Sequence, residues 1–225
     1  MTHQPDSHSI RIDGNSLWFL NSVKYLGVRI DRTLSMQEQI GSICRACFLE
    51  LRRIASIRPF LTQTSCAKLV NALITSRLDF CNSVLIGLPA EQLGRLQRVQ
   101  NSAARLVLKK GRREHITPFL QHLHWLPVKY RCQYKILVFA YRHFLGTLPT
   151  YLSASLTTYQ PSRTLRSASE KLLKVPKRNL KSFGQRSFSY LAPIFWNALP
   201  SEVRNAPTLS VFKKKLKTFL FCEAY

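Results

Sequence analysis

Acidic residues are scarce in this sequence of 225 residues. Only 11 Asp and Glu side chains stand against 34 Lys and Arg, and the formal net charge is +23 at pH 7. No two acidic residues lie within five positions of each other, and there is no Asp-Asp or Asp-x-Asp pair. Two-metal phosphoryl-transfer sites hold carboxylates close together, so the spacing of the acidic residues does not favour such a site.

Other sequence patterns of catalysis and of membrane insertion are also absent. The eight glycines form neither a G-x-G-x-x-G nor a Walker pattern, and there is no G-x-S-x-G. No apolar run approaches the roughly 18–20 residues that span a bilayer, and residues 1–10 lack the apolar core of a signal peptide. We therefore expect an intracellular protein with no membrane partner, in which the six cysteines are mostly reduced.

The cysteines Cys44 and Cys47 form a C-x-x-C, for which two interpretations exist. A zinc site would need two more ligands, and His122 and His124 are the obvious candidates. No second C-x-x-C follows at the spacing of a zinc finger, and both cysteines fall on the apolar side of a predicted helix. Because small buried cysteines are ordinary core residues, we favour the structural interpretation and expect neither a metal nor a cofactor.

The apolar pattern predicts a mainly α protein with a small N-terminal β hairpin or ribbon. Alternation over residues 22–31 is typical of one strand, and we expect it to fold back on residues 8–20. A helix follows from Ser35, with Ser35 and Glu38 as its capping box, and Pro59 ends it. Further helices are expected after Thr64, over 90–110, and over 119–125 after a cap at Thr117. Others are expected from Pro127 to Gly146, after Pro149 and after Thr208. A helical stretch is also expected after Gly184, divided by Pro193 and Pro200.

The positive charge is concentrated in the second part of the chain. Residues 1–90 carry 10 basic and 6 acidic side chains, whereas residues 91–225 carry 24 and 5. A chain this basic favours a polyanionic partner, and nucleic acid is the first to consider. We expect three parts: a β hairpin over 1–34, a helical domain over 35–114, and a basic helical region over 115–225 with a basic loop at 157–183.

One predicted helix, over residues 90–110, carries a basic face. Its basic residues recur at intervals of three, seven and four positions, so they share one side of the helix. No acidic residue occurs between Glu91 and Glu114, whereas an ordinary solvated face mixes both signs. We interpret this face as one that binds an RNA or DNA backbone without reading its sequence. The candidate residues are Arg95, Arg98, Arg105, Lys109, Lys110, Arg112 and Arg113.

Eight short stretches, in order and covering nearly the whole chain, carry a resemblance to a known family. They are VKYLGVRIDRTLS (23–35), LVNALITSRLDFCNSVLIGLP (69–89), LQRVQNSAARLV (96–107), HITPFLQHLHWLPVKYRCQYKILVFAY (115–141), LPTYLS (148–153), PSRTLRSA (161–168), FGQRSFSYLAPIFWNALPSEVR (183–204) and LSVFKKKLKTFLF (209–221). The chain resembles the C-terminal third of the reverse transcriptase encoded by vertebrate LINE-type, non-LTR retrotransposons, in the branch of the chicken-repeat and jockey-like elements.

The resemblance implies the end of a polymerase palm over 1–34, a thumb-like domain over 35–114 that grips the template–primer duplex, and a C-terminal region that binds RNA or DNA. The family's Phe/Tyr-Ala-Asp-Asp motif has no counterpart here, so no catalytic residue is carried over. We therefore expect a non-catalytic fragment of RNA-directed DNA polymerase ancestry, and not an enzyme. Two alternatives stay open: a protein–protein interaction module that associates with polymerase-encoding copies of the element, and an unselected fragment with no function.

Overall fold

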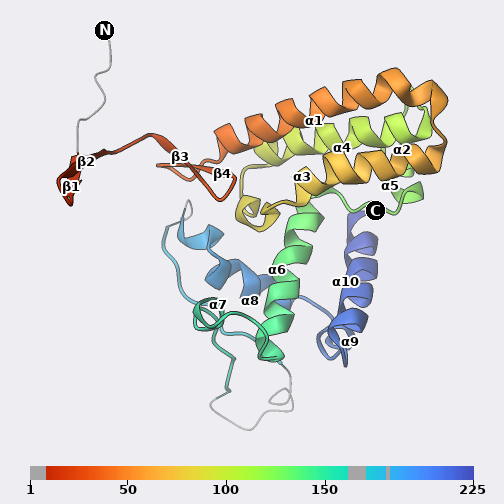
Figure 1. Ribbon diagram of the computed structural model, residues 1–225. Helices are drawn as coiled ribbons and strands as arrows, with labels where there is room; N and C mark the ends of the chain where they lie inside the picture. Colours follow the sequence, from red (N-terminus) through yellow and green to blue (C-terminus); the bar gives the residue numbers. More distant parts are fainter. Residues whose placement is uncertain (1–8, 162–170, 181–182) are drawn as a thin grey trace.

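The computed structural model describes residues 9–161, 171–180 and 183–225, and these form a mainly α-helical protein (Figure 1). The four strands are β1 (Ser9–Ile12), β2 (Asn15–Trp18), β3 (Ser22–Tyr25) and β4 (Val28–Asp31). The helical elements are α1 (Gln37–Ile57), η1 (Arg58–Phe60), α2 (Gln63–Val70), η2 (Asn71–Thr75), α3 (Ser76–Asp79), η3 (Asn82–Leu85), α4 (Ala90–Leu108), α5 (Thr117–His122), α6 (Val128–Phe144), α7 (Thr150–Ser153), η5 (Gly184–Arg186), α8 (Phe188–Asn197), α9 (Ser201–Arg204) and α10 (Leu209–Ala224).

The N-terminal strands form two separate antiparallel hairpins, β1–β2 and β3–β4. The prediction of one strand over 22–31 that folds back on 8–20 is therefore wrong. Leu26 and Gly27 break that stretch, with φ of 46° and 85°, the positive values that a two-residue hairpin turn requires. Because leucine rarely adopts this backbone conformation, the alternating apolar pattern did not indicate a turn at this position.

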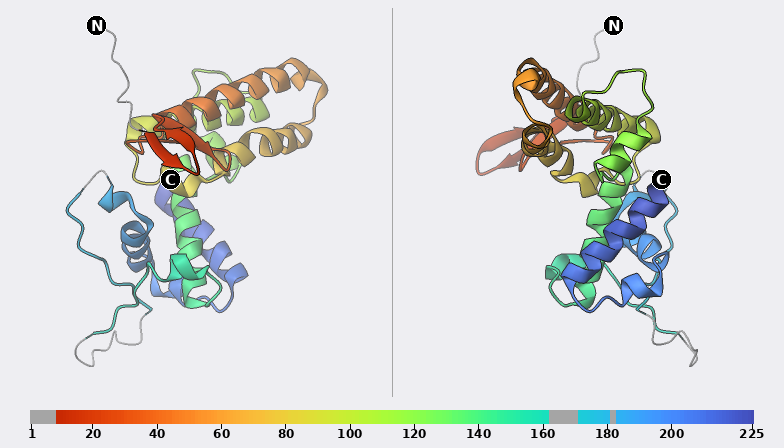
Figure 2. Two further views of the ribbon diagram at one scale, coloured as in Figure 1. Left: turned by 60° about the vertical axis from the view of Figure 1, so that its left-hand side comes forward. Right: turned by 90° about the vertical axis from the view of Figure 1, so that its right-hand side faces the viewer.

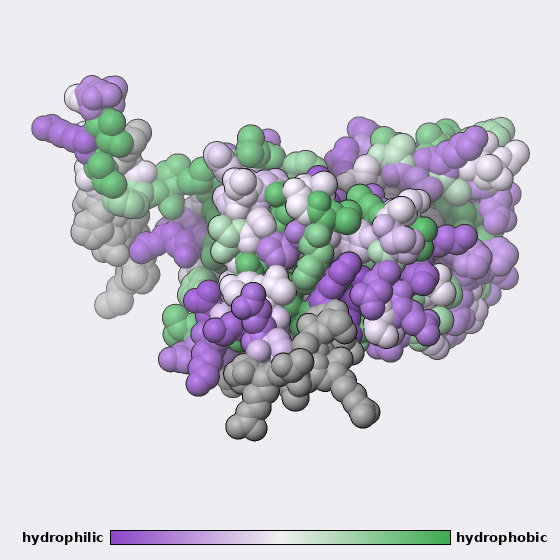
Figure 3. All heavy atoms as spheres, turned by 90° about the horizontal axis from the view of Figure 1, so that it is seen from below, coloured by the Kyte–Doolittle hydropathy of each residue, from purple (hydrophilic) through white to green (hydrophobic). Residues whose placement is uncertain are grey.

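The second hairpin packs on the start of α1, while the first stands away from the body (Figures 1 and 2). The Arg29 backbone N–H donates to Gln39 Oε1 at 2.8 Å, which joins β4 to α1. Large apolar side chains of the hairpins are exposed, among them Trp18, Tyr25 and Leu26, which is 80 % exposed. The arm at the upper left of Figure 3 shows this apolar surface in green.

The loop that leads into α1 is held by Asp31, while the helix itself has no side-chain cap, so the predicted capping box of Ser35 and Glu38 is wrong. The Asp31 carboxylate accepts hydrogen bonds from the Thr33 N–H and hydroxyl and from the Ser35 and Met36 N–H groups, at 2.7–3.1 Å. Glu38 turns instead to the Ser22 hydroxyl, which donates to it at 2.8 Å. Burial alone raises the pKa of the Asp31 carboxyl, but these hydrogen bonds outweigh it and lower the pKa to about 2.

Helices α1, α2 and α4 pack together as one layer, with α1 and α4 side by side (Figures 1 and 2). The predicted apolar stripe of the first helix is confirmed, since Ile40, Ile43, Cys44, Cys47, Leu51 and Ile54 are all buried. The segment after Thr62 is helical through α2, η2 and α3, and the Thr62 hydroxyl caps its first turn. Pro59 lies just beyond the end of α1, as predicted.

Helix α6 connects this layer to the C-terminal helices, since its contacts reach α3, η3 and α4 as well as α8 and α10. Figure 1 shows it running down from the layer beside α10. Arg131 of α6 pairs with Asp79 at the end of α3, where its Nε donates to Oδ1 at 2.8 Å and its Nη2 pairs with Oδ2. Further along, the Tyr141 ring stacks on Phe212 of α10 at a centroid distance of 4.1 Å.

The described part of the basic loop, residues 157–161 and 171–180, is anchored by α8. The Asn197 side chain both accepts from the Leu173 N–H at 3.0 Å and donates to its carbonyl at 2.8 Å. The Trp196 indole donates to the Lys171 carbonyl at 2.6 Å, and Leu173 is buried. Arg163, Arg166 and Lys181, which contributed to the prediction of a basic loop, lie outside the described residues.

Two details of the C-terminal half differ from the prediction. Pro193 lies inside α8 and does not interrupt it, whereas Pro200 does precede a separate helix, α9. Thr117 is the first residue of α5 and not its cap, because Ile116 holds the cap position. The start of a helix at Pro127 and its end before Gly146 are confirmed, and the last helix begins after Thr208, whose hydroxyl accepts from the Val211 N–H.

We predict that Asp31→Ala lowers the free energy of unfolding by about 1–2 kcal/mol at pH 7, because the hydrogen bonds that its carboxylate accepts in the loop before α1 are lost. Because the pKa of Asp31 is lowered in the folded state, its contribution is complete above about pH 4 and is lost as the pH falls towards 2. Denaturant titrations followed by circular dichroism should show the difference between wild type and variant shrinking over that range. The exposed carboxylate Glu223 supplies the control, Glu223→Ala, and an equal loss there would contradict the role assigned to Asp31.

Candidate nucleic-acid interface

The predicted basic face belongs to α4 and to the loop that follows it. From Arg95 to Lys109 the face is about 21 Å long, which matches about six base pairs of duplex. Arg98 is exposed in the middle of this face, and Arg95 is half-buried towards α1. Arg98 points away from the buried stripe of α4, which is Leu96, Val99, Ala103 and Val107, whereas Arg95 lies at the edge of that stripe, one turn before Val99.

Arg105 holds the loop after α4 in place. Its Nε donates to the Gly111 carbonyl at 3.2 Å, and its Nη2 donates to the Glu114 carbonyl at 3.0 Å. The Glu114 carboxylate in turn accepts from the Gly111 N–H at 2.6 Å and pairs with Lys110 at 3.5 Å. Two of the predicted binding residues, Arg105 and Lys110, are therefore already engaged within the loop.

The remaining predicted residues lie in the exposed part of this loop. Lys109 ends α4 in the left-handed conformation, with φ of 53°. Arg112 and Arg113 are exposed at the tip, as is Lys109. The structure thus gathers Lys109, Lys110, Arg112 and Arg113 at the C-terminal end of α4, and places Arg95 near its other end.

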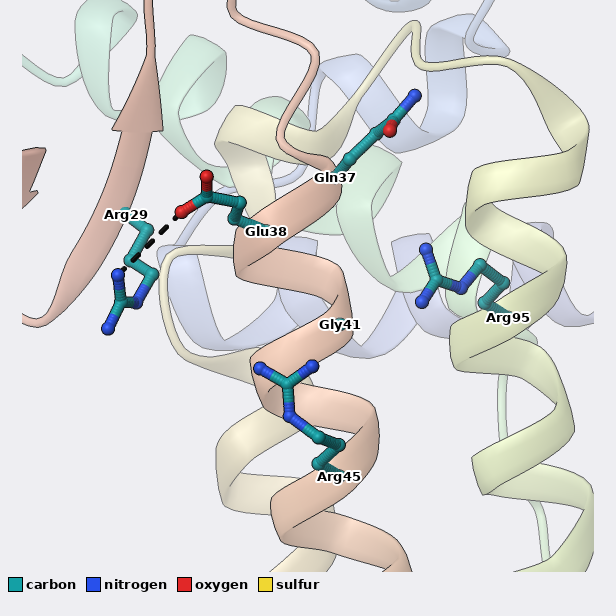
Figure 4. A pocket seen from close by; sticks show the side chains of 6 residues that line it. All are labelled: Arg29, Gln37, Glu38, Gly41, Arg45 and Arg95. Carbon is teal, nitrogen blue, oxygen red and sulfur yellow. Dashed lines mark ion pairs between the residues drawn. The ribbon is translucent and has the colours of Figure 1, made fainter. Parts of the chain in front are cut away.

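A hollow of about 420 Å³ lies between the N-terminal parts of α1 and α4 (Figure 4). Gly41 of α1 forms its floor and is buried. A Cβ atom built on Gly41 would lie 3.5 Å from Arg45 Nη1 and 3.6 Å from Arg95 Nη2, so both guanidinium groups border the same space. The hollow is lined by Arg29, Gln37, Glu38, Gly41, Arg45 and Arg95.

Among the described residues that line this hollow, Glu38 is the one that carries a carboxylate, and that carboxylate points away from Arg45 and Arg95. Glu38 pairs with Arg29 of β4 at 3.7 Å and accepts the hydroxyl hydrogen of Ser22 in β3. Figure 4 shows Glu38 directed at Arg29, while the Arg45 side chain lies over α1 near Gly41 and the Arg95 side chain extends from α4 towards α1. The second hairpin therefore holds the acidic group away from the two arginines.

The chain was compared with protein-family models, with curated proteins and with solved structures. None of the three comparisons finds a match. The arrangement of charges along α1, α4 and the following loop therefore has to support a function by itself.

The two cysteines of the C-x-x-C lie in the core beneath these arginines. Burial raises the pKa of the Cys44 thiol against the opposing effect of Arg95, Arg98 and Arg45, and burial raises that of Cys47 to about 11. Within the described ranges, no three His, Cys, Asp or Glu side chains gather in a way that could hold a metal ion, and no helix is long and apolar enough to cross a membrane.

Sequence reasoning did not identify Arg29 or Arg45 as members of the site. Arg45 stands seven residues after Glu38 in a predicted helix, and nothing in the spacing shows that it meets a residue of the helix at 90–110. A helical glycine four residues before an arginine, as Gly41 is before Arg45, is the one local signal. This spacing indicates a site only when it is known that the neighbouring helix brings Arg95 to the same place.

We predict that Arg105→Lys loosens the loop while the positive charge stays. Lysine cannot reproduce the two hydrogen bonds of the guanidinium group, and a loss of about 1 kcal/mol raises the open population of the loop about fivefold. Limited trypsin digestion followed by mass spectrometry should show faster cleavage between Lys109 and Arg113. Arg98→Lys, which also keeps the charge at an exposed position, is the control; equal cleavage of the two variants would contradict the role assigned to Arg105.

Proposed function

We propose that the chain is a non-catalytic nucleic-acid-binding protein, a fragment of retrotransposon reverse transcriptase that keeps the thumb-like and C-terminal regions. The observation that carries the proposal is the basic face of α4, which has no acidic residue between Glu91 and Glu114. Exposed Arg98 lies between the arginines at the hollow and the basic loop at 109–113. The ancestry is supported by the eight sequence stretches that resemble that family.

The geometry favours contacts with a phosphate backbone and not with bases. Cations spread along about 21 Å of one helix can follow successive phosphates without reading the grooves. The Arg105 bonds and the Lys110–Glu114 pair hold the loop in one arrangement, so less order has to be imposed on it when nucleic acid binds. The partner that this surface fits is RNA or DNA, bound without sequence preference.

A second candidate function is a protein-interaction module. The observation that favours it is the exposed apolar surface of the hairpins, where Trp18, Phe19 and Leu20 are each about 60 % exposed. Both hairpins also leave strand edges that a partner's sheet could extend. Light scattering of the purified chain tests the version in which a second copy docks there: Trp18→Ser should abolish dimers, and a wild-type monomer contradicts that version.

We predict that binding of a primer–template duplex weakens steeply with salt, because each phosphate contact releases a counterion. Arg98→Glu combined with Arg112→Glu should lower the affinity about tenfold or more and reduce the slope of log K against log salt by about two. Filter-binding titrations between 50 and 200 mM salt, a range in which such contacts weaken measurably, provide the measurement.

The matched control replaces two exposed lysines near the start of α10, Lys213→Glu with Lys214→Glu; this end of α10 lies beside α9 and away from α4 (Figure 1). These changes alter the net charge by the same amount, so a general charge effect would appear in both variants. Equal losses would contradict the binding face on α4. Binding that does not depend on salt, or no binding at low salt, would contradict the proposed function.

A further inference from the structure

We propose that the hollow between α1 and α4 is a binding site for one phosphate monoester, held between Arg45 and Arg95 above Gly41. This deepens the proposed function, and it rests on that function only in assigning the phosphate to the end of a nucleic-acid strand. The site itself is argued from the arrangement of charged groups around the hollow.

The geometry brings two guanidinium groups to one small space. Arg45 and Arg95 come from different helices, yet each has a terminal nitrogen within 3.6 Å of the position that a Gly41 side chain would begin to fill. Because Gly41 has no side chain, the space between them is open to the hollow. A ligand seated there would rest on the α1 backbone and meet a guanidinium group on either side (Figure 4).

The charges of Arg45 and Arg95 are not compensated within the described parts of the chain. Neither guanidinium group has a hydrogen bond or an ion pair with a described residue. Glu38, which could pair with either, is held by Arg29 and Ser22. Two cations that border one space repel each other, and an anion bound between them removes that repulsion.

The number of charges and donors favours a monoester over a backbone diester. Arg29 and Glu38 cancel, so Arg45 and Arg95 leave two positive charges at the hollow. A phosphate monoester carries a charge of about −1.5 to −2 at pH 7 and three acceptor oxygens, and planar guanidinium groups bind such oxygens in pairs. A diester carries one negative charge and leaves part of this donor set unused.

The first experiment titrates the full chain with inorganic phosphate by calorimetry, in chloride buffer of constant ionic strength. We expect one site in the wild type, and at least about tenfold weaker binding in Gly41→Leu and in Arg45→Ala, since a charge-assisted contact is lost in each. Gly94→Leu is the matched control, because it also replaces a helical glycine, but the leucine side chain that it introduces points into open space. Absence of phosphate binding, or equal effects of Gly41→Leu and Gly94→Leu, would overturn the proposal.

The second experiment separates a strand end from the backbone. One oligonucleotide, with either a 5′-phosphate or a 5′-hydroxyl, is titrated by fluorescence anisotropy against the wild type and the same variants. The phosphorylated strand should bind about tenfold more tightly to the wild type and to Gly94→Leu, and the advantage should vanish in Gly41→Leu. Equal affinity of both strands for the wild type overturns the assignment to a strand end. If neither strand binds, the proposed function fails, and the phosphate titration still decides on the hollow.

Discussion

Arg58 is the residue on which the α1–α4 surface depends. Its buried guanidinium group donates to the carbonyls of Leu106 and Val107 at 2.9 and 2.8 Å, and to that of Leu61 at 2.7 Å. These bonds satisfy carbonyls at the end of α4 that have no partner inside the helix, and they place a positive charge where the helix dipole is negative. They also tie the C-terminal end of α1 to the C-terminal end of α4, so the two helices run in the same direction. Arg45 and Arg95 meet over Gly41 because of that arrangement.

The N-terminal hairpins contribute to the same surface although they add little to the core. Asp31 starts α1 at a defined residue, and the Arg29–Gln39 hydrogen bond attaches β4 to the helix. With β4 attached, Arg29 and Ser22 hold the Glu38 carboxylate away from the hollow, so the net charge at the hollow stays positive. The β3–β4 hairpin therefore acts on the electrostatics of the α1–α4 pair, while apolar side chains of both hairpins stay exposed.

The helices could be predicted from the sequence because their buried stripes follow helical spacing over several turns, as Ile40, Cys47 and Ile54 show. The basic face of α4 could be predicted for the same reason. Four features could not be predicted from the sequence. The turn at Leu26 and Gly27 uses a residue that rarely adopts positive φ. The loop before α1 is held by Asp31, six residues before the helix, through hydrogen bonds that no periodicity indicates. Arg45 lies close to Arg95 because of tertiary contacts between segments that are far apart in the sequence. The hydrogen bonds of Arg105 depend on the shape of the loop that follows α4.

The central claim is that nucleic acid lies along α1, α4 and the loop at 109–113. Chemical footprinting of arginine side chains, read residue by residue with mass spectrometry, tests it most directly. With a primer–template duplex bound, we predict protection of Arg45, Arg95, Arg98, Arg112 and Arg113, and unchanged reactivity at Arg142 and Arg178 in the C-terminal half. Protection confined to the C-terminal half, with Arg95 and Arg98 as reactive as in the free protein, would contradict the account.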